Sequence, residues 1–501
     1  MTFTGYSGAD PEWNTAADYS NGTVQGLDFA IPPQPRQFVF GINLIYNFKE
    51  KSCMKRKIYY ASLIWGLLLI QTSCDSILNQ TPANYVSDSG IIVDEASAEA
   101  ALNGVYHRLA ANEYYGGGIF NAAIYLSGDN VTWTGSLNYY YDYNTHQYGA
   151  DNQLLSSAWN AIYSTVNQAN QVIDKVTLLN NVSNTQKMQI VSEATLIRSL
   201  AFFDLARTWG NVPLIREATS SPTQFSGVKQ TDAKEVYREV ITDVTNIYGG
   251  LSAITDRAHV SKATADAFLA RVYLYSEDWD SAEKYATRLI ENTNYELVDY
   301  PTFMKQKQSS ESIWELTYSS SFQNNHSYYW LSSNNGGRHE WGPSKELVKL
   351  LSDPLIGGTR KVLYSDLSTA QVPDYYVGNL YYRSTGDDPA YLFRISEQYL
   401  IRAEARIKKS TPDVVGALVD LNAVRKRSGV PDFKSQHVSE IIQAIEDENR
   451  VEFALEPHRW FDLVRTHRAT FVLGIKEYQT IFPIPYNDIL ADPDLVQNEN
   501  Y

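Results

Sequence analysis

Residues 263–292 read ATADAFLARVYLYSEDWDSAEKYATRLIEN, and small residues recur in this segment at helical spacing. Ala267 and Ala270 lie on one stripe of the first half, and Ala282 and Ala286 lie on one stripe of the second half. Small residues at these positions let two helices approach each other closely. The segment therefore predicts a helix hairpin, which is two helices joined by a short turn.

The same helical periodicity recurs along the chain, in residues 98–109, 159–173, 194–209 and 399–427. With one aromatic residue in its turn, the 263–292 hairpin resembles a tetratricopeptide unit, and such units bury their apolar faces only by stacking. Four tryptophans fall in these helix patterns and are expected to be packing residues: Trp159, Trp209, Trp279 and Trp460. We predict a mainly α fold, with tetratricopeptide-like helix pairs as a scaffold and a loop-rich, irregular binding half.

The composition excludes several classes of protein. The 501 residues carry a net charge of −15 without a basic patch, which disfavours nucleic-acid binding. Two cysteines cannot form a disulfide framework or a four-thiolate zinc site. The 36 tyrosines exceed the tryptophans and phenylalanines together. Because Tyr has an apolar face and a polar tip, this excess suits a surface that binds a flat, polar ligand.

A targeting signal begins inside the chain. Met54–Lys57 is a cationic run, Ile58–Ile70 is mostly apolar and too short for the roughly 20 residues of a membrane-spanning helix, and small residues precede Cys74. This order resembles a bacterial lipoprotein signal, although Gln71 stands where an aliphatic residue is preferred. We expect residues 54–73 to be a signal peptide and Cys74 to become the acylated first residue, anchored at the cell surface in the outer membrane. The alternative is a buried apolar helix ending in an ordinary Cys.

Residues 1–53 do not fit this plan, because a signal peptide should not begin at residue 54. From Phe38 to Phe48 large apolar residues alternate with other residues, which is typical of a lipid-facing barrel strand. Residues 1–48 resemble the C-terminal end of a SusC-like TonB-dependent transporter. Closing a barrel takes at least about eight strands, so we interpret residues 1–53 as an orphan transporter fragment or a misassigned start, with Met54 as the true start. The alternative is a genuine N-terminal strand pair.

Several motifs in order make the rest of the chain recognisable. They are AYLFRISEQYLIRAEA at 390–405, LIRSLAFFDL at 196–205, WGNVPL at 209–214, LNAVRKR at 421–427, ENRVEFA at 448–454, RWFDLVR at 459–465, FPIP at 482–485 and DLVQNENY at 494–501. Together they resemble the SusD/RagB family of Bacteroidetes outer-membrane lipoproteins, over residues 74–501. The resemblance implies one SusD-like domain, no catalysis, binding of glycans or other nutrients, and a partner SusC-like transporter.

Long segments with poor helical periodicity separate the helix pairs, at 129–152, 217–231, 294–342 and 353–389. They are rich in Asn, Ser, Gly and Tyr. Loops of this length in a packed protein are usually functional or disordered, and their aromatic content argues against disorder. We expect them to form the binding half of the molecule.

Glycan recognition needs flat aromatic faces and short polar side chains, and residues 129–146 and 324–341 supply both. When Tyr139–Tyr141 is treated as a period-2 run, at least one ring must point inward, so about half of these aromatics should be core. The residues predicted to contact the ligand with exposed rings are Trp133, Tyr140, Tyr329, Trp330 and Trp341, and Asn334 and Arg338 are predicted as polar partners.

No cofactor or metal site is predicted. Glu446–Glu448 is interpreted as a solvated helix face, and His458 as an exposed turn residue. Asp278–Asp280 opens like a calcium-binding EF-hand loop, but Ala282 stands where the third oxygen ligand belongs.

Two rival functions remain open. A surface glycoside hydrolase would need two carboxylates in the aromatic cleft, and Asp129 and Asp142 are the candidates. A peptide-binding relative would use the same scaffold with a different cargo. The motif RWFDLVR argues for scaffolding, because Arg459, Asp462 and Arg465 are spaced one turn apart and can pair along a helix.

Overall fold

The computed structural model describes residues 92–221 and 224–501. The transporter-like segment 1–53, the signal peptide 54–73 and Cys74 lie outside the described residues. Within the described ranges, no helix combines the length and the apolar character needed to cross a bilayer.

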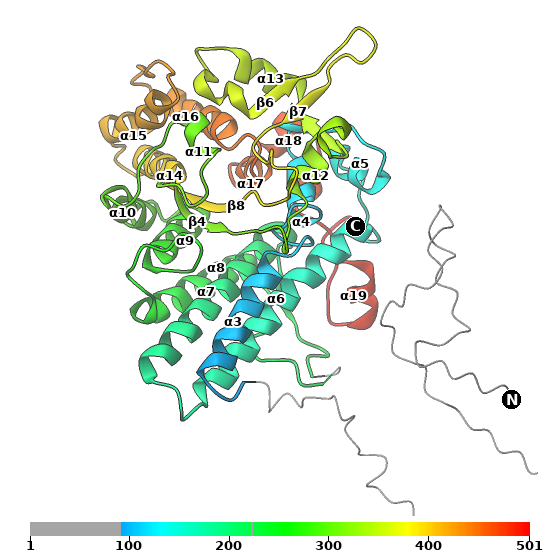
Figure 1. Cartoon of the computed structure of the whole chain (residues 1–501), viewed down its shortest axis with the longest axis vertical. Coiled ribbons are helices and arrows are strands. Elements are labelled where there is room, and N and C mark those ends of the chain that lie inside the picture. The colour runs from blue at the N-terminus through cyan, green and yellow to red at the C-terminus, as the bar shows by residue number, and fades with distance from the viewer. Residues whose placement is uncertain (1–91, 222–223) are drawn as a thin grey trace, which may run out of the picture. The chain divides into compact units, whose positions relative to one another are not determined.

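Long helices form the scaffold, and they pack mainly as sequence neighbours (Figure 1). They are α3 (Glu95–Leu109), α6 (Gln153–Thr177), α7 (Asn184–Trp209), α8 (Ala233–Ile247), α9 (Lys262–Tyr275), α10 (Trp279–Ile290), α14 (Ile395–Lys408), α15 (Val414–Arg427) and α16 (Val438–Glu452). Helix α6 packs on α7, α9 on α10, and α14 on α15, while α10 also packs on α14. The predicted stacking of helix pairs is confirmed.

The 263–292 segment forms the predicted hairpin as α9 and α10. Ser261 caps α9, and the side chain of Asp278 caps α10 by accepting a hydrogen bond of 3.1 Å from the Ser281 backbone N–H. Asp278 is therefore a helix cap. The small residues at the crossing are fully buried: Ala267, Ala270, Ala282 and Ala286. Their size permits the close approach of the two helices.

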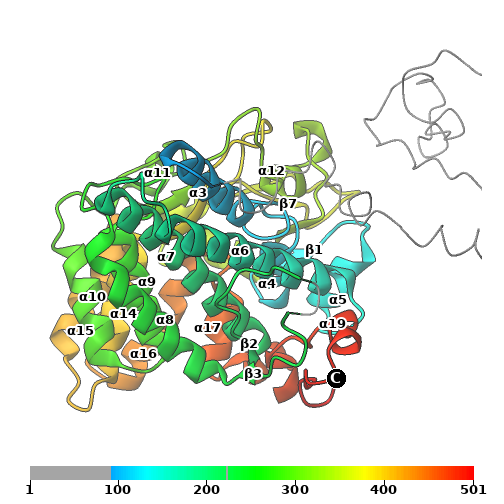
Figure 2. The same ribbon diagram turned by 90° about the horizontal axis from the view of Figure 1, so that it is seen from below.

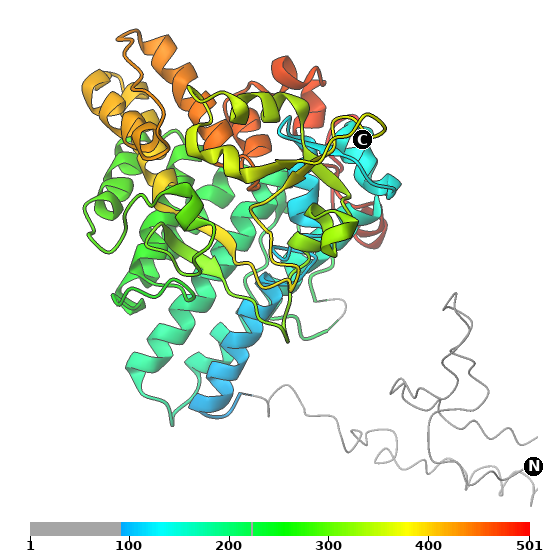
Figure 3. The ribbon, with the colours of Figure 1, turned by 45° about the horizontal axis from the view of Figure 1, so that its top comes forward.

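The irregular half contains short helices, 3-10 turns and two-stranded ribbons. The helices are α4 (Phe120–Ser127), α5 (Asn138–Asn144), α11 (Tyr300–Phe303), α12 (His326–Trp330), α13 (Lys345–Ser352), α17 (Arg459–Arg465), α18 (Ala469–Leu473) and α19 (Tyr486–Ala491). The 3-10 turns are η4 (Tyr248–Gly250), η5 (Ser333–Asn335), η6 (Gly358–Leu363) and η7 (Glu477–Thr480). Figures 1, 2 and 3 show α5 and α12 on the side of the folded domain away from α10 and α15.

The described strands form two-stranded antiparallel pairs. Some pairs join segments that are far apart in the sequence, and others join the two sides of one loop. The pairs are β1 (Val131–Trp133) with β5 (Trp341–Pro343), β2 (Val212–Pro213) with β3 (Gln230–Thr231), β4 (Ser312–Leu316) with β8 (Ala390–Arg394), and β6 (Tyr364–Asp366) with β7 (Tyr376–Gly378). The β1–β5 pair brings the two tyrosine-rich segments, 129–146 and 324–341, to one place.

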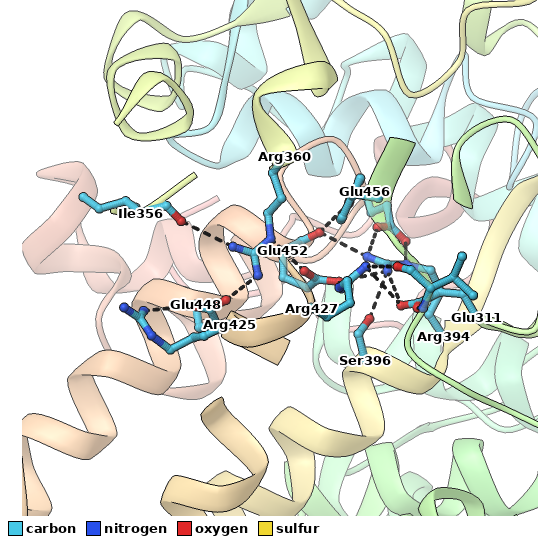
Figure 4. A network of polar contacts seen from close by, with 12 residues as sticks. Glu311, Ile356, Arg360, Arg394, Ser396, Arg425, Arg427, Glu448, Glu452 and Glu456 are labelled. Carbon is cyan, nitrogen blue, oxygen red and sulfur yellow. Dashed lines mark hydrogen bonds and ion pairs between the residues drawn. The ribbon is translucent and has the colours of Figure 1, made fainter. Parts of the chain in front are cut away.

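A buried ion-pair network locks the C-terminal motifs together (Figure 4). Arg394, at the end of β8, bonds to Glu311, Glu452 and Glu456 at 2.6–3.1 Å. The other arginines and glutamate of the network are Arg360, Arg425, Arg427 and Glu448. Buried charges require partners in this way. The network connects β4, β8, η6, α15 and α16, so the family-like motifs there serve as scaffold.

Two predictions about charged residues need correction. Glu448 is 1% exposed and pairs with Arg360 and Arg425, so it is not on a solvated face. His458 is partly buried and stacks on Phe453, with ring centroids 4.4 Å apart. Burial lowers the pKa of His458 well below its ordinary value, and the surrounding arginines act in the same direction.

The spacing argument for helix α17 holds for one of its two pairs. Arg465 pairs with Asp462 at 2.8 Å, as the one-turn spacing predicted. Arg459 instead bonds to Asp129 at 2.6 Å. Spacing within α17 could not predict Asp129 as the partner of Arg459, because Asp129 lies in the loop before β1.

Candidate ligand-binding surface

The β1–β5 ribbon organises the aromatic residues of the irregular half. In this ribbon Trp133 stands opposite Trp341. Helix α5 follows β1 and helix α12 precedes β5, so their tyrosines gather around these two rings. The rings divide into a buried cluster and an exposed rim.

The buried cluster centres on Trp341. Its ring stacks on Tyr329 at 4.8 Å and meets Tyr140 edge-on at 5.0 Å and Trp330 edge-on at 6.1 Å. Tyr140 also donates a hydrogen bond of 2.6 Å to the Gly118 carbonyl. The prediction that Tyr140, Trp330 and Trp341 are exposed is wrong, since all three are 0% exposed. Edge-on and stacked rings fill this core, where large aromatic surfaces contribute most to stability.

The exposed rim consists of five rings, which we call the aromatic surface: Trp133, Tyr139, Tyr141, Tyr328 and Tyr329. Tyr141 is 43% exposed and Tyr328 is 45% exposed, and the other three are partly exposed. Trp133 meets Tyr141 at 5.1 Å, and Tyr328 meets Tyr329 at 5.2 Å. Two of these rings, Trp133 and Tyr329, were selected from the sequence, and their partial exposure agrees with that selection.

The selection from the sequence missed three exposed rings, Tyr139, Tyr141 and Tyr328, which lie on the short helices α5 and α12. In α5 the buried residues are Tyr140 and Tyr143, which leaves Tyr141 outward. In α12 His326 and Trp330, four residues apart, point inward, which leaves Tyr328 outward. The Tyr139–Tyr141 run was treated as a period-2 run, but it lies in helix α5, where Tyr140 faces inward together with Tyr143.

Buried Glu340 shapes the polar edge of this surface. Its carboxylate accepts hydrogen bonds from the backbone N–H groups of Ser136 and Leu137 at 3.1 and 3.2 Å, and from the Arg338 guanidinium. Arg338 also donates to the Ser136 hydroxyl at 3.2 Å. The structure thus places Arg338 beside the aromatic surface, between β5 and the loop that leads into α5. Asn334 lies exposed in η5.

The hydroxyl of Tyr139 stays protonated at physiological pH. Partial burial raises the pKa of Tyr139, and the neighbouring Tyr329 and Glu340 act in the same direction. A neutral hydroxyl donates one hydrogen bond and accepts others. The surface therefore offers ring faces, hydroxyls and one guanidinium to a ligand.

Asp129 and Asp142, the candidate catalytic carboxylates, hold structural partners. Asp129 pairs with Arg459 at 2.6 Å and Arg450 at 2.9 Å. Burial acts to raise the pKa of Asp129, but the hydrogen bond and charge of Arg459 outweigh it, and the pKa falls below its ordinary value. A general acid needs a raised pKa, so Asp129 does not suit that role. Asp142 accepts a hydrogen bond of 3.1 Å from Asn152.

Comparisons with known proteins agree with this architecture. A family model described as "SusD family" matches residues 367–474, and one described as "Starch-binding associating with outer membrane" matches residues 84–274. The chain belongs to the SusD family. SusD family members are non-catalytic binding proteins, so the prediction that the chain is not an enzyme is confirmed and the hydrolase alternative is excluded.

Some relatives within the SusD family match most of the chain, and others match a shorter part. SusD-like protein P2 of Formosa agariphila is 25% identical over 497 residues, which is 87% of this chain and 96% of the relative. Starch-binding protein SusD of Bacteroides thetaiotaomicron is 34% identical over 174 residues, which is 30% of each chain. A solved laminarin-binding SusD-like protein superposes with a TM-score of 0.71 at 24% identity, over 82% of this chain and 100% of that chain. The predicted mainly α, SusD-like fold is confirmed.

Proposed function

We propose that this SusD family protein binds an oligosaccharide or polysaccharide nutrient on its aromatic surface, without catalysis. The observation that carries the proposal is the exposed rim of five rings beside Arg338, with Asn334 exposed in the turn η5. Two comparisons support the ligand class: one matching family model is described as starch-binding, and the relative at 34% identity is named a starch-binding protein.

The chemistry of the aromatic surface suits a sugar chain. Ring faces stack on the apolar face of a pyranose, while hydroxyls and amides bond to its hydroxyl groups. Because the rings lie on an exposed surface, each contact is modest and the affinity should be moderate. Moderate affinity suits a protein that must release its cargo.

Removing the two rings of one exposed pair should weaken glycan binding strongly. At about 1 kcal/mol for each lost stack, Trp133→Ala or Tyr141→Ala should lower affinity roughly fivefold, and the double variant roughly thirtyfold. Affinity-gel electrophoresis of the intact chain in detergent, against starch, laminarin and other polysaccharides, measures the change.

Trp279→Ala is the matched control, because Trp279 is also a partly exposed tryptophan but packs within the helix pairs at α10. It should leave glycan retention unchanged. Equal retention by the Trp133→Ala/Tyr141→Ala variant and the unchanged protein would refute the aromatic surface as the binding site. Retention of peptides instead of any polysaccharide would favour the peptide-binding alternative.

We further propose that the protein is lipid-anchored at Cys74 and passes its cargo to a SusC-like TonB-dependent outer-membrane transporter. The signal-like order before Cys74 and the transporter-like pattern in residues 1–48 support this proposal. On this interpretation residues 1–53 are absent from the mature protein. Co-purification of a TonB-dependent transporter with the membrane-extracted protein tests the partnership.

Replacing Cys74 by serine should release the protein from the membrane fraction. The thiol is the acceptor of the lipid, and a hydroxyl at this position does not replace it. Mass spectrometry of the native protein measures the outcome: the mature chain should begin at an acylated Cys74. An intact product that retains residues 1–53 would contradict both the signal and the interpretation of the N-terminal segment.

A further inference from the structure

A cavity lies on the helix scaffold, between α3 and α6. It measures about 600 Å³, which is within the usual range for small-ligand sites. Small residues of α3 form its floor, and an added Cβ at Gly104 would lie 3.7 Å from the Gln168 side chain. Residues 218–220 form one rim, fixed to α6 by hydrogen bonds from Ala218 to Asp174 and from Thr219 to Asn167. We call this cavity the basic groove.

The charge of the basic groove is opposite to that of the whole chain. Arg108, Lys175 and His107 line it, and no Asp or Glu of the described residues does. Among residues 92–221 and 224–501, neither Arg108 nor Lys175 forms an ion pair, whereas most other arginines do. The nearby Asp174 accepts the amide of Ala218 at 3.1 Å. Two cationic side chains thus face a cavity without a carboxylate partner in the described part of the chain.

The remaining lining combines small apolar residues of α3 with side chains that can form hydrogen bonds. Gln168 and Gln171 stand one turn apart on α6, and no hydrogen bond joins either amide to another described residue. Thr219 adds a hydroxyl on the rim. Among the residues that the structure describes, no strand borders the groove, so they provide no backbone edge on which an extended peptide could pair. Paired amides beside cationic groups suit a carbohydrate that carries anionic groups.

His107 extends the groove toward the irregular half. Its ring stacks on Phe322, with centroids 4.3 Å apart, and it also lines a neighbouring cavity of about 220 Å³. That cavity is lined by Tyr106, His259 and Phe322 as well. A ligand longer than one sugar unit therefore has room beyond Arg108.

We propose that the basic groove is a second carbohydrate site, which binds the carboxylate or sulfate groups of an acidic oligosaccharide. The inference rests on the proposed function and deepens it, because it assigns a charged class of glycan to the protein. Arg108 and Lys175 contact the anionic group, and Gln168 and Gln171 bond to neighbouring hydroxyls.

The test compares two double variants of the intact chain in detergent. Arg108→Gln/Lys175→Gln removes two positive charges from the groove, and Lys361→Gln/Lys434→Gln removes two exposed ones elsewhere. The probes are polygalacturonate, dextran sulfate and neutral dextran, together with a neutral polysaccharide retained by the aromatic surface. We expect the groove variant to bind the acidic probe at least roughly tenfold more weakly at low salt, and the control variant to bind it normally.

The outcomes separate this inference from the proposed function. Retention of polygalacturonate alone assigns a carboxylate ligand, and retention of dextran sulfate alone assigns a sulfate ligand. If the unchanged protein binds neither, or if both double variants lose binding equally, the basic groove is not an anion site. Loss of neutral-glycan binding in Trp133→Ala, without any retention of acidic probes, would overturn the groove and leave the aromatic surface in place.

Discussion

Replacing Arg394 by methionine should destabilise the protein by about 3–5 kcal/mol, because the substitution leaves buried carboxylates without their cationic partner. Arg394 is 1% exposed and bonds to Glu311, Glu452 and Glu456. Burial already raises the pKa of Glu456 despite the opposing charge of Arg394. The predicted loss is a large part of the roughly 5–15 kcal/mol that stabilises a typical domain. Urea unfolding followed by circular dichroism measures it.

Two further variants make this prediction specific. Arg394→Lys keeps the charge but loses the planar fork that reaches several partners, so its cost should be intermediate. Arg238→Met removes an exposed ion pair with Glu235 on α8 and should change the unfolding midpoint little. An Arg394→Met protein as stable as the unchanged one would show that the network of Figure 4 does not hold the fold.

Replacing Glu404 by glutamine should cost about 3 kcal/mol at neutral pH, and the cost should vanish in acid. Burial acts to raise the pKa of Glu404, but Arg465 and Lys408 outweigh it and lower the pKa to about 2. Their hydrogen bonds to the carboxylate measure 2.8–2.9 Å. A lowered folded-state pKa stabilises the fold above the ordinary value of 4.5. That stabilisation disappears as the pH falls through about 2.

The measurement is the difference in unfolding free energy between the unchanged protein and Glu404→Gln, from pH 7 downward. The difference should be constant above about pH 5 and should shrink steadily between pH 4.5 and 2. Glu440→Gln, an exposed change on α16, is the control and should show no such dependence. A difference that stays constant into acid would mean that Glu404 contributes by packing rather than by charge.

The helix scaffold could be predicted from the sequence because its signals are local. Alanines at helical spacing mark the crossing of α9 and α10, and polar residues cap both helices. Such patterns depend on residues within two turns of each other. Segment 263–292 therefore folds as predicted, with α9 and α10 beginning and ending within a few residues of the expected positions.

The aromatic surface could be predicted only in part. The two tyrosine-rich segments were assigned to the binding half, and the pairing of β1 with β5 brings them together. Which rings face solvent depends on the short helices α5 and α12, and these have too few residues to show a clear period. Trp330 and Trp341 look like ligand-binding residues in the sequence but fill the core between the two segments.

The sequence by itself determined the family, the helix pairs and the tyrosine-rich segments, because each is written in contiguous or regularly spaced residues. The tertiary structure decided which rings are exposed, that Arg459 pairs with Asp129 rather than Asp462, and that Arg108 and Lys175 share one groove. The physical reason is that burial and charge pairing depend on residues brought together across hundreds of positions. Patterns among residues close in the sequence do not predict such neighbours.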